Sequence, residues 1–158
     1  MVVKDIKLRI AGDRDAGDIA RMVNLAFGPE RFFADGDRTN PDKIRNLLQK
    51  GKFLLAEEAG GLIGCVYLEL RGERAYFGLL AVGPERQKSG LGSYLISVAE
   101  NEARAAGCRM MDLTIVNLRK ELPAYYQRRG YAESGTMPFP ADQKSKLPCH
   151  LIKMSKAL

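Results

Sequence analysis

The sequence predicts a single mixed α/β domain, and three observations support this fold class. The chain has 158 residues, enough to bury one core but too few for two domains, so we expect one domain over residues 1–158. Apolar residues make up 46% and charged residues 28%, a balance that is ordinary for a globular domain. Segments with strand and helix periodicity follow one another in the order β-α-α-β-β-β-α-β-α-β-β.

The N-terminal third predicts one strand and two helices. Residues 6–10, "IKLRI", indicate the first strand. Residues 13–27 carry apolar side chains at the spacing of one helical face, and Asp13 is the expected N-cap. A connection rich in glycine and aspartate over 28–41 leads to a second helix over 41–51, which has proline in its first turn and glycine as its stop.

Three segments rich in β-forming residues follow and predict an antiparallel meander. Residues 52–59 and 61–71 are joined at Gly60-Gly61, a pair that is typical of a hairpin turn. A short "RGER" turn then leads to the next strand at 75–82. All three strands are therefore expected to lie side by side in one sheet.

The C-terminal half predicts a long helix from about Ser89 to 107, a buried strand at 108–116, a short helix within 119–130, and final strands at 131–135 and 148–156. Pro123 is compatible with the short helix because it falls near the first turn. The long helix is expected to turn one stripe of side chains toward the core: Leu91, Tyr94, Leu95, Val98 and Glu102.

Charge and composition exclude several classes of protein. The net charge of +6 permits an anionic partner, but the basic residues form no concentrated stripe, so we expect no nucleic-acid partner. No run approaches 18 apolar residues and the N-terminus lacks a signal-peptide pattern, so we expect a cytoplasmic protein with no membrane partner.

The cysteines and the single histidine predict no metal site. Cys65, Cys108 and Cys149 are odd in number, far apart and set in apolar stretches, which favours reduced, buried thiols. His150 follows Cys149, but two ligands are too few for zinc. We therefore expect His150 to be packed or to lie on a strand surface.

The turn between the strand at 75–82 and the long helix predicts an anion-binding site. Gly90 and Gly92 allow the backbone to approach a bulky ligand, and the first amides of the helix have no partner within it. A P-loop would need lysine after its last glycine, where Ser93 stands. A dinucleotide-binding turn would need a third glycine, where Leu95 stands.

Two segments resemble the GNAT superfamily of N-acetyltransferases. "QKSGLG" at 87–92 matches the Q/R-x-x-G-x-G/A acetyl-CoA signature, and "VNLRKELPAYYQRRGY" at 116–131 is similar to the N-x-x-A-x-x-L-Y-x-x-x-G-F/Y segment. The order of elements along the chain agrees with that family. The resemblance implies an α+β GNAT fold: a mostly antiparallel central sheet of six to seven strands, with helices on both faces and splayed fourth and fifth strands.

The resemblance also implies a reaction and its residues. Acetyl-CoA would be the co-substrate, and its acetyl group would pass to a primary amine by direct attack in a ternary complex, with Tyr126 as general acid toward the leaving thiolate. The backbone of the fourth strand would bind pantetheine, the glycine turn would bind pyrophosphate, and Asn117 would contact the cofactor. The implied cofactor-binding residues are Leu80, Ala81, Val82, Gln87, Lys88, Ser89, Gly90, Leu91, Gly92, Ser93, Asn117 and Tyr126.

The general base and the acceptor are left open by the sequence. Many members carry a carboxylate on the fourth strand where this chain has Tyr76, so Tyr76 as a water-ordering group and Glu69 on the neighbouring strand are both candidates. Residues 28–40 and 133–147 are expected to shape the acceptor site. There, four side chains either line a site for a cationic amine or form a loop with aromatic anchors: Phe32, Phe33, Asp35 and Asp37.

The partners that the resemblance implies are an amine acceptor, either a small molecule or a protein amine, and a second copy of the chain in a homodimer. A non-enzymatic hypothesis competes with the transferase. A catalytically silent acyl-CoA-binding sensor would explain why Tyr76 stands where many members have a carboxylate.

Overall fold

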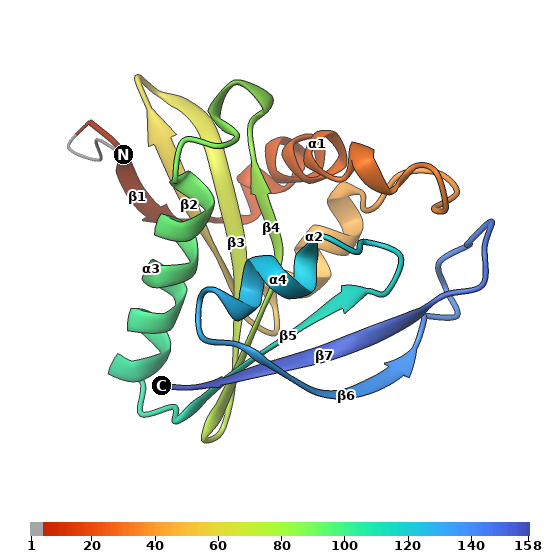
Figure 1. Cartoon of the computed structure of the whole chain (residues 1–158). Helices are drawn as coiled ribbons and strands as arrows, with labels where there is room; N and C mark the ends of the chain where they lie inside the picture. Colours follow the sequence, from red (N-terminus) through yellow and green to blue (C-terminus); the bar gives the residue numbers. More distant parts are fainter. Residues whose placement is uncertain (1–4) are drawn as a thin grey trace.

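The computed structural model describes residues 5–158 and confirms the mixed α/β fold (Figure 1). One sheet of seven strands has the order β1-β2-β3-β4-β5-β7-β6, and every neighbouring pair is antiparallel except β4 with β5. The strands are β1 Lys7–Ile10, β2 Lys52–Glu58, β3 Gly61–Arg71, β4 Arg74–Val82, β5 Met110–Val116, β6 Ala132–Pro138 and β7 His150–Ala157.

Helices cover both faces of this sheet, as the sequence predicts. The four helices are α1 Ala16–Ala26, α2 Pro41–Leu48, α3 Leu91–Ala105 and α4 Leu122–Gln127. Successive side chains of a strand point to opposite faces, and β2 shows this directly. Phe53 and Leu55 pack in the cluster that contains α1 and α2, whereas Leu54 and Ala56 pack in the cluster that contains α3. The sheet is therefore the middle layer between two apolar cores.

The first helix begins differently from the expectation, and Asp13 as its N-cap is wrong. Residues Asp13–Asp15 form a 3-10 turn that leads into α1. Within it, the Asp15 carboxylate accepts a hydrogen bond of 2.8 Å from the amide of Gly12. Asp15 is held from the other side by Arg9 of β1, a contact that local spacing cannot reveal.

The β2–β3 hairpin turns one residue earlier than expected. Ala59 and Gly60 occupy the two positions with positive φ, at 52° and 80°, and Gly61 is already the first residue of β3. A two-residue hairpin of this kind needs positive φ at both central positions, so the turn accepts alanine in a conformation that favours glycine.

The long helix begins at Leu91 rather than Ser89, and its buried face is rotated from the expected stripe. Leu91 and Leu95 are buried as expected, but Tyr94, Val98 and Glu102 are only half-buried. The rest of the buried face is Ile96, Ala99, Glu100 and Ala103. The small alanine side chains let the helix axis approach the sheet closely, which moves the contact toward their side.

The cysteine prediction is confirmed for two of the three thiols. Cys65 and Cys108 are buried, and burial raises the pKa of Cys65 to about 12. Cys149 is half-buried instead, because the segment before β7 runs over the surface. All three are free cysteines. His150 is exposed at the start of β7, in agreement with the expected strand-surface position.

Within residues 5–158, no three side chains of the metal-ligating types cluster. No helix in the same residues has the length and apolar character needed to cross a membrane.

Arg9 joins β1 to β2 and to the start of α1, and this contact gives a testable prediction. Its guanidinium lies 2.7 Å from Asp15 and 2.9 Å from Glu57. The hydrogen bond from Arg9 lowers the pKa of Asp15 to about 2. The contribution of the pair is therefore complete above about pH 4 and is lost as the pH falls toward about 2.

We expect Asp15→Asn to lower the free energy of unfolding by about 1 kcal/mol at pH 7. The difference from the parent should shrink as the pH falls from 4 to 2, measured by urea unfolding at several pH values. Asp18→Asn is the matched control, because Asp18 pairs only with the exposed Arg21 on the same helix. A difference that stayed constant down to the lowest pH would contradict the role given to this pair.

Candidate functional site

The site is built where β4 and β5 separate. The two strands pair in parallel only from Arg74 with Met110 to Tyr76 with Asp112. Beyond Tyr76 they part, which confirms the splayed fourth and fifth strands, and in Figure 1 β5 and β7 slant away from β4. A cleft of about 690 Å³ lies here, walled by β4, β5, β7, the α1–α2 connection and the β6–β7 connection. The C-terminal part of β4 thus has no strand partner on its β5 side.

A β-bulge in β4 lies at the wall of this cleft. Cys65 of β3 faces Ala81 while Tyr67 faces Gly78, so two residues of β4, Leu79 and Leu80, oppose a single residue of β3. Leu79 has a φ of 48°, a left-handed conformation that is costly for a leucine. Both leucines line the cleft. The bulge therefore turns the backbone of β4 out of the regular ladder where the cleft opens.

The other two predicted residues of β4 lie elsewhere. Ala81 is buried in the cluster with α1 and α2, and Val82 is half-buried against the α3 side. Neither lines the cleft, so only their backbone can serve it from the free side of the strand.

The turn before α3 has the open amides expected of an anion site. Gly90 has a φ of 91° and Lys88 a φ of 65°, which curl the chain into the helix. Within residues 5–158, the backbone N–H groups of Lys88, Gly90, Gly92 and Ser93 find no acceptor. Four unsatisfied donors at the positive end of the α3 dipole favour a phosphate or pyrophosphate group.

The remaining residues of that turn support the loop from the inside. The Gln87 amide donates to the carbonyl of Val82 at 3.5 Å, and the Ser89 hydroxyl accepts from the amide of Leu91 at 3.4 Å. The Leu91 side chain is fully buried in the core below α3. Leu91 can therefore contribute only its backbone to a ligand.

α4 approaches this turn and adds a cation that the sequence analysis missed. A Cβ atom placed on Gly92 would lie 3.0 Å from the Tyr125 hydroxyl, a tight approach that a larger residue could make only if Tyr125 shifted. The Arg129 guanidinium stacks on the Tyr125 ring at 3.6 Å and donates to the Ser93 hydroxyl at 3.0 Å. The basic "QRRG" run was visible in the sequence, but its contact with the turn depends on the packing of α4 against α3.

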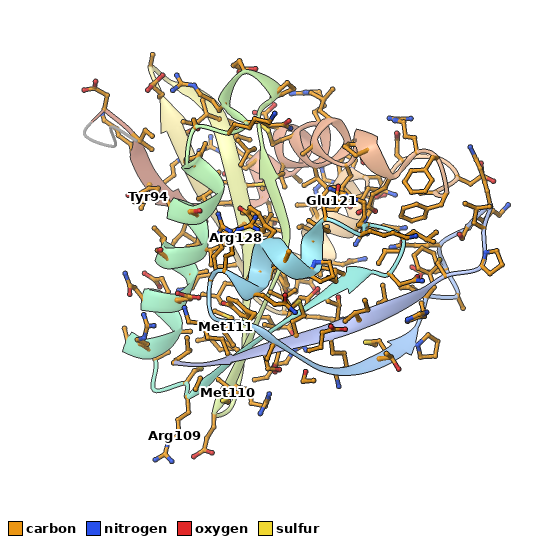
Figure 2. All side chains as sticks on the ribbon, viewed as in Figure 1. Tyr94, Arg109, Met110, Met111, Glu121 and Arg128 are labelled. Atoms are coloured by element: carbon orange, nitrogen blue, oxygen red, sulfur yellow. The ribbon has the colours of Figure 1, made fainter. Side chains whose placement is uncertain are left out.

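Tyr126 is buried in an aromatic cluster and faces the cleft. Figure 2 shows Glu121 and Arg128 at the two ends of α4, the helix that carries it. Its ring packs against Phe77, Tyr125 and Tyr131. Its hydroxyl has no side-chain partner among the described residues, yet no buried polar atom there is unsatisfied, so the hydroxyl opens into the cleft. Burial raises the pKa of Tyr126, which keeps the phenol protonated.

Of the two candidates for the base that the sequence suggested, only one lines the cleft. Tyr76 lines the cleft, and the guanidinium of Arg71 lies over its ring at 4.6 Å. Glu69 faces Tyr76 across the β3–β4 ladder but does not line the cleft. Burial alone would raise the pKa of Glu69, but the hydrogen bonds from Tyr67 and Arg71 outweigh it and lower that pKa. Glu69 is thus held as an ion-paired carboxylate beside the cleft.

Asn117 lies just after β5 and is tied to β7. Its side-chain oxygen accepts a hydrogen bond of 2.8 Å from the amide of His150, and its own amide donates to the His150 carbonyl at 3.0 Å. Asn117 does not line the cleft. Its observed contacts fix the end of β5 against the start of β7.

A buried carboxylate that the sequence analysis missed does line the cleft. Glu30 is only 6% exposed, and Arg119 donates to its Oε2 at 3.0 Å. Burial raises the pKa of Glu30, and the nearby guanidinium groups of Arg119 and Arg38 only partly offset this. Glu30 and Arg119 are 89 residues apart in the chain, so no local pattern could have paired them.

The two segments expected to shape the acceptor site do meet. Ala34 forms an isolated bridge with Ser145, and the amide of Lys146 donates to the carbonyl of Phe33. The side chains expected to line the site, however, do not: Phe32, Phe33, Asp35 and Asp37. Phe33 is fully buried and Phe32 is exposed, which fits the reading as a loop with an aromatic anchor. The cleft is lined instead by Glu30 and Arg38 from the first segment, with Phe27 just before it, and by Met137, Phe139 and Gln143 from the second.

The Glu30–Arg119 pair yields a prediction about stability. Arg119→Gln leaves the buried Glu30 carboxylate without its guanidinium, and we expect a loss of about 3 kcal/mol at pH 7. Because the pKa of Glu30 is raised in the folded state, its carboxyl takes up a proton there as the pH falls, and a neutral carboxyl no longer needs the guanidinium. The stability that a carboxyl with a raised pKa contributes is present at low pH and is lost as the pH rises through the folded-state pKa. The loss should therefore shrink between pH 7 and pH 5, measured by urea unfolding.

Glu121→Gln is the control for this change. Its carboxylate is largely exposed and shares Arg119 at 3.4 Å, so its removal should change the unfolding free energy by less than about 0.5 kcal/mol. Equal losses for the two variants would show that Glu30 is not a buried charge that depends on Arg119.

Comparison with solved structures places the fold. The chain superposes on Ard1 from Thermoplasma volcanium with a TM-score of 0.80 at 16% identity, over 98% of each chain. It superposes on the ribosomal-protein-alanine N-acetyltransferase from Brucella melitensis with a TM-score of 0.75 at 20% identity, over 96% of this chain and 99% of the other. For yncA from Salmonella typhimurium, solved with its cofactor acetyl-CoA, the TM-score is 0.69 at 21% identity over 98% and 95%.

Comparison by sequence places the family. The chain is 25% identical over 95 residues to the uncharacterized protein YdhI of Bacillus subtilis (strain 168), a match that covers 60% of this chain and 58% of that protein's length. The model of the Acetyltransferase (GNAT) family matches residues 19–131, a range that holds α3, α4, the separated strands β4 and β5 and most of α1. The chain therefore belongs to the GNAT family of acetyltransferases.

Proposed function

We propose that the protein is an N-acetyltransferase that moves an acetyl group from acetyl-CoA to a primary amine by direct attack in a ternary complex. One observation carries this proposal: the unpaired side of β4 and the Tyr126 hydroxyl meet in the cleft where β4 and β5 separate, and the open amides before α3 follow β4 directly in the chain. Membership of the GNAT family supports the reaction class.

The residues present fit coenzyme A. The amides of Lys88, Gly90, Gly92 and Ser93 would bind its pyrophosphate, and Arg129 lies beside Ser93 to add positive charge. The free side of β4 after the bulge would pair with the amide groups of pantetheine like an added strand. The bound group would supply a thioester, which is an activated acyl donor.

Tyr126 acts as the general acid in this mechanism. Burial keeps its phenol protonated, and its hydroxyl opens into the cleft, so it can donate a proton to the departing thiolate. A backbone amide at the bulge, near Leu80, stabilises the oxygen that gains negative charge during attack. The new N–C bond forms, the C–S bond breaks, and the sulfur leaves with the tyrosine proton.

Glu30 is the residue that we propose as the base. Its Oε2 is held by Arg119, its Oε1 has no donor among the described side chains, and the residue lines the cleft. Burial raises its pKa, which makes it a better proton acceptor than an exposed glutamate. The proton lost by the amine passes to Glu30 directly or through a water that Tyr76 can help to order. Glu69 is less suited because its carboxylate is already engaged by Tyr67 and Arg71.

Tyr126→Phe tests the proposed function. The ring still packs with Phe77 and Tyr131, so we expect the fold and acetyl-CoA binding to be kept while kcat for thiol release falls by about 10²-fold or more. The assay is thiol release from acetyl-CoA with a mixed panel of primary amines. Tyr94→Phe is the matched control, since Tyr94 lies on α3 outside the cleft (Figure 2).

The outcomes separate the hypotheses. Unchanged turnover in Tyr126→Phe would retain the transferase and reduce Tyr126 to a packing role. Tight acetyl-CoA binding without turnover for any amine would favour the silent acyl-CoA sensor instead.

Gly90→Val tests the anion-binding turn. Valine is strongly disfavoured at a φ of 91°, so the turn must change shape, and we expect acetyl-CoA to bind at least about tenfold more weakly by calorimetry. Gly17→Ala, at a helical position with open space around it, is the control and should bind acetyl-CoA like the parent. Parent-like binding by a folded Gly90→Val protein would place the pyrophosphate elsewhere.

A further inference from the structure

The cleft carries more positive than negative charge. Five basic side chains line the cleft, and only two carboxylates, Glu30 and Asp112, line it with them. The basic residues are Arg38, Arg71, Arg74, Arg119 and Lys153. None of the turn residues from 87 to 93 lines this cleft, so these cations are separate from the proposed pyrophosphate site.

Three of the five cations form ion pairs with carboxylates of the protein. Arg74 pairs with Asp112 at 2.6 Å, Arg119 pairs with Glu30 at 3.0 Å, and Arg71 pairs with Glu69. Within residues 5–158, the other two have no carboxylate in ion-pair distance: Arg38 and Lys153. The surplus charge of the cleft is therefore concentrated on these two side chains, one from the α1–α2 connection and one from β7.

Arg38 is held in position without a carboxylate of its own. Its guanidinium lies over the Phe27 ring at 5.4 Å from the centroid, and both residues line the cleft. The next residue, Thr39, is buried, and Asn24 of α1 binds its backbone N–H at 3.0 Å and its C=O at 3.1 Å. Stacking and a fixed backbone limit the motion of the guanidinium, so it loses little freedom when it binds an anion.

A guanidinium presents a planar fork of N–H donors that matches a carboxylate or phosphonate. Arg38 has this fork free, and it lies beside Glu30, the carboxylate whose other neighbour is Arg119. An acceptor with an acid and an amine would satisfy both groups: the acid pairs with Arg38 and the amine is directed to Glu30. The same charges repel a polyamine.

We propose that the acceptor is a small amine that also bears an acidic group, a carboxylate or phosphonate, which Arg38 binds at the mouth of the cleft. This inference rests on the proposed transferase function and specifies its substrate class. It reverses the expectation of a cationic acceptor, because the aspartates on which that expectation rested, Asp35 and Asp37, do not line the cleft.

The experiment compares matched acceptors. Initial rates of thiol release from acetyl-CoA are measured with the standard amino acids and with 2-aminoethylphosphonate. The amino-acid carboxamides, which lack the acidic group, are measured as matched analogues. Spermidine and a peptide with a free N-terminus complete the panel. The parent protein should favour at least one acid over its carboxamide by roughly 10- to 100-fold in kcat/KM, the ratio that corresponds to the free energy of a charge-assisted hydrogen bond.

Two variants assign that preference to Arg38. In Arg38→Gln the ratio between acid and carboxamide should fall to near one; the ratio is the readout because loss of the Arg38 charge also acts on Glu30 and so changes the rates with both acceptors. Arg38→Lys should keep part of the ratio, because it keeps the charge but not the fork. Arg21→Gln is the control: it removes the same charge from the exposed face of α1, outside the cleft, and should keep the full ratio.

Binding is measured as well, so that the result does not depend on turnover. Calorimetry of the same acids and carboxamides is run on the protein loaded with coenzyme A. Arg38-dependent binding of the acids supports the proposal even if the protein is a silent sensor and the transferase function fails. The proposal would be overturned if each acid and its carboxamide reacted and bound equally, or if the preference for the acid survived in Arg38→Gln. It would also be overturned if spermidine or the peptide were the only acceptor acetylated.

Discussion

The separation of β4 from β5 is the constraint on which the site depends. Their ladder ends at Tyr76 and Asp112, so along the rest of β4 the backbone groups on its β5 side are paired with no strand among residues 5–158. Unpaired backbone groups in a cleft are stabilised by a ligand that can complete the ladder, as pantetheine can with its two amides. The bulge at Leu79 and Leu80 lies in this unpaired part of β4.

The turn before α3 and the cleft offer different kinds of binding group. The turn, which does not line the cleft, offers backbone amides whose direction is set by the chain geometry. The cleft offers the side-chain charges of Glu30, Arg38 and Arg119, from segments that have no regular structure in common. Side-chain charges can change from chain to chain while the backbone stays the same, which is why a fold shared at 16% to 21% identity does not specify the acceptor.

The Glu30–Arg119 pair links the connection between α1 and α2 to the loop after β5. Taking both charges out of water costs about as much as their attraction returns, so the pair adds little net stability. Its importance lies in position, because it fixes a carboxylate with a raised pKa in the same cleft as the Tyr126 hydroxyl. Protonated phenol and basic carboxylate are the two proton-transfer groups that acyl transfer to an amine requires.

Periodicity and turn residues determined the order of elements and the glycine turn before α3, because each depends on neighbours within about ten residues, whereas the splayed strands were expected only from the resemblance of two motifs to a known family. The same local rules failed where a distant residue decides: Asp15 rather than Asp13 is held by Arg9, and the buried face of α3 follows the small residues Ala99 and Ala103 that fit the sheet. Only the tertiary structure placed Glu30 beside Arg119 and left Arg38 without a partner, since burial and pairing of charges are properties of packing between segments far apart in the chain.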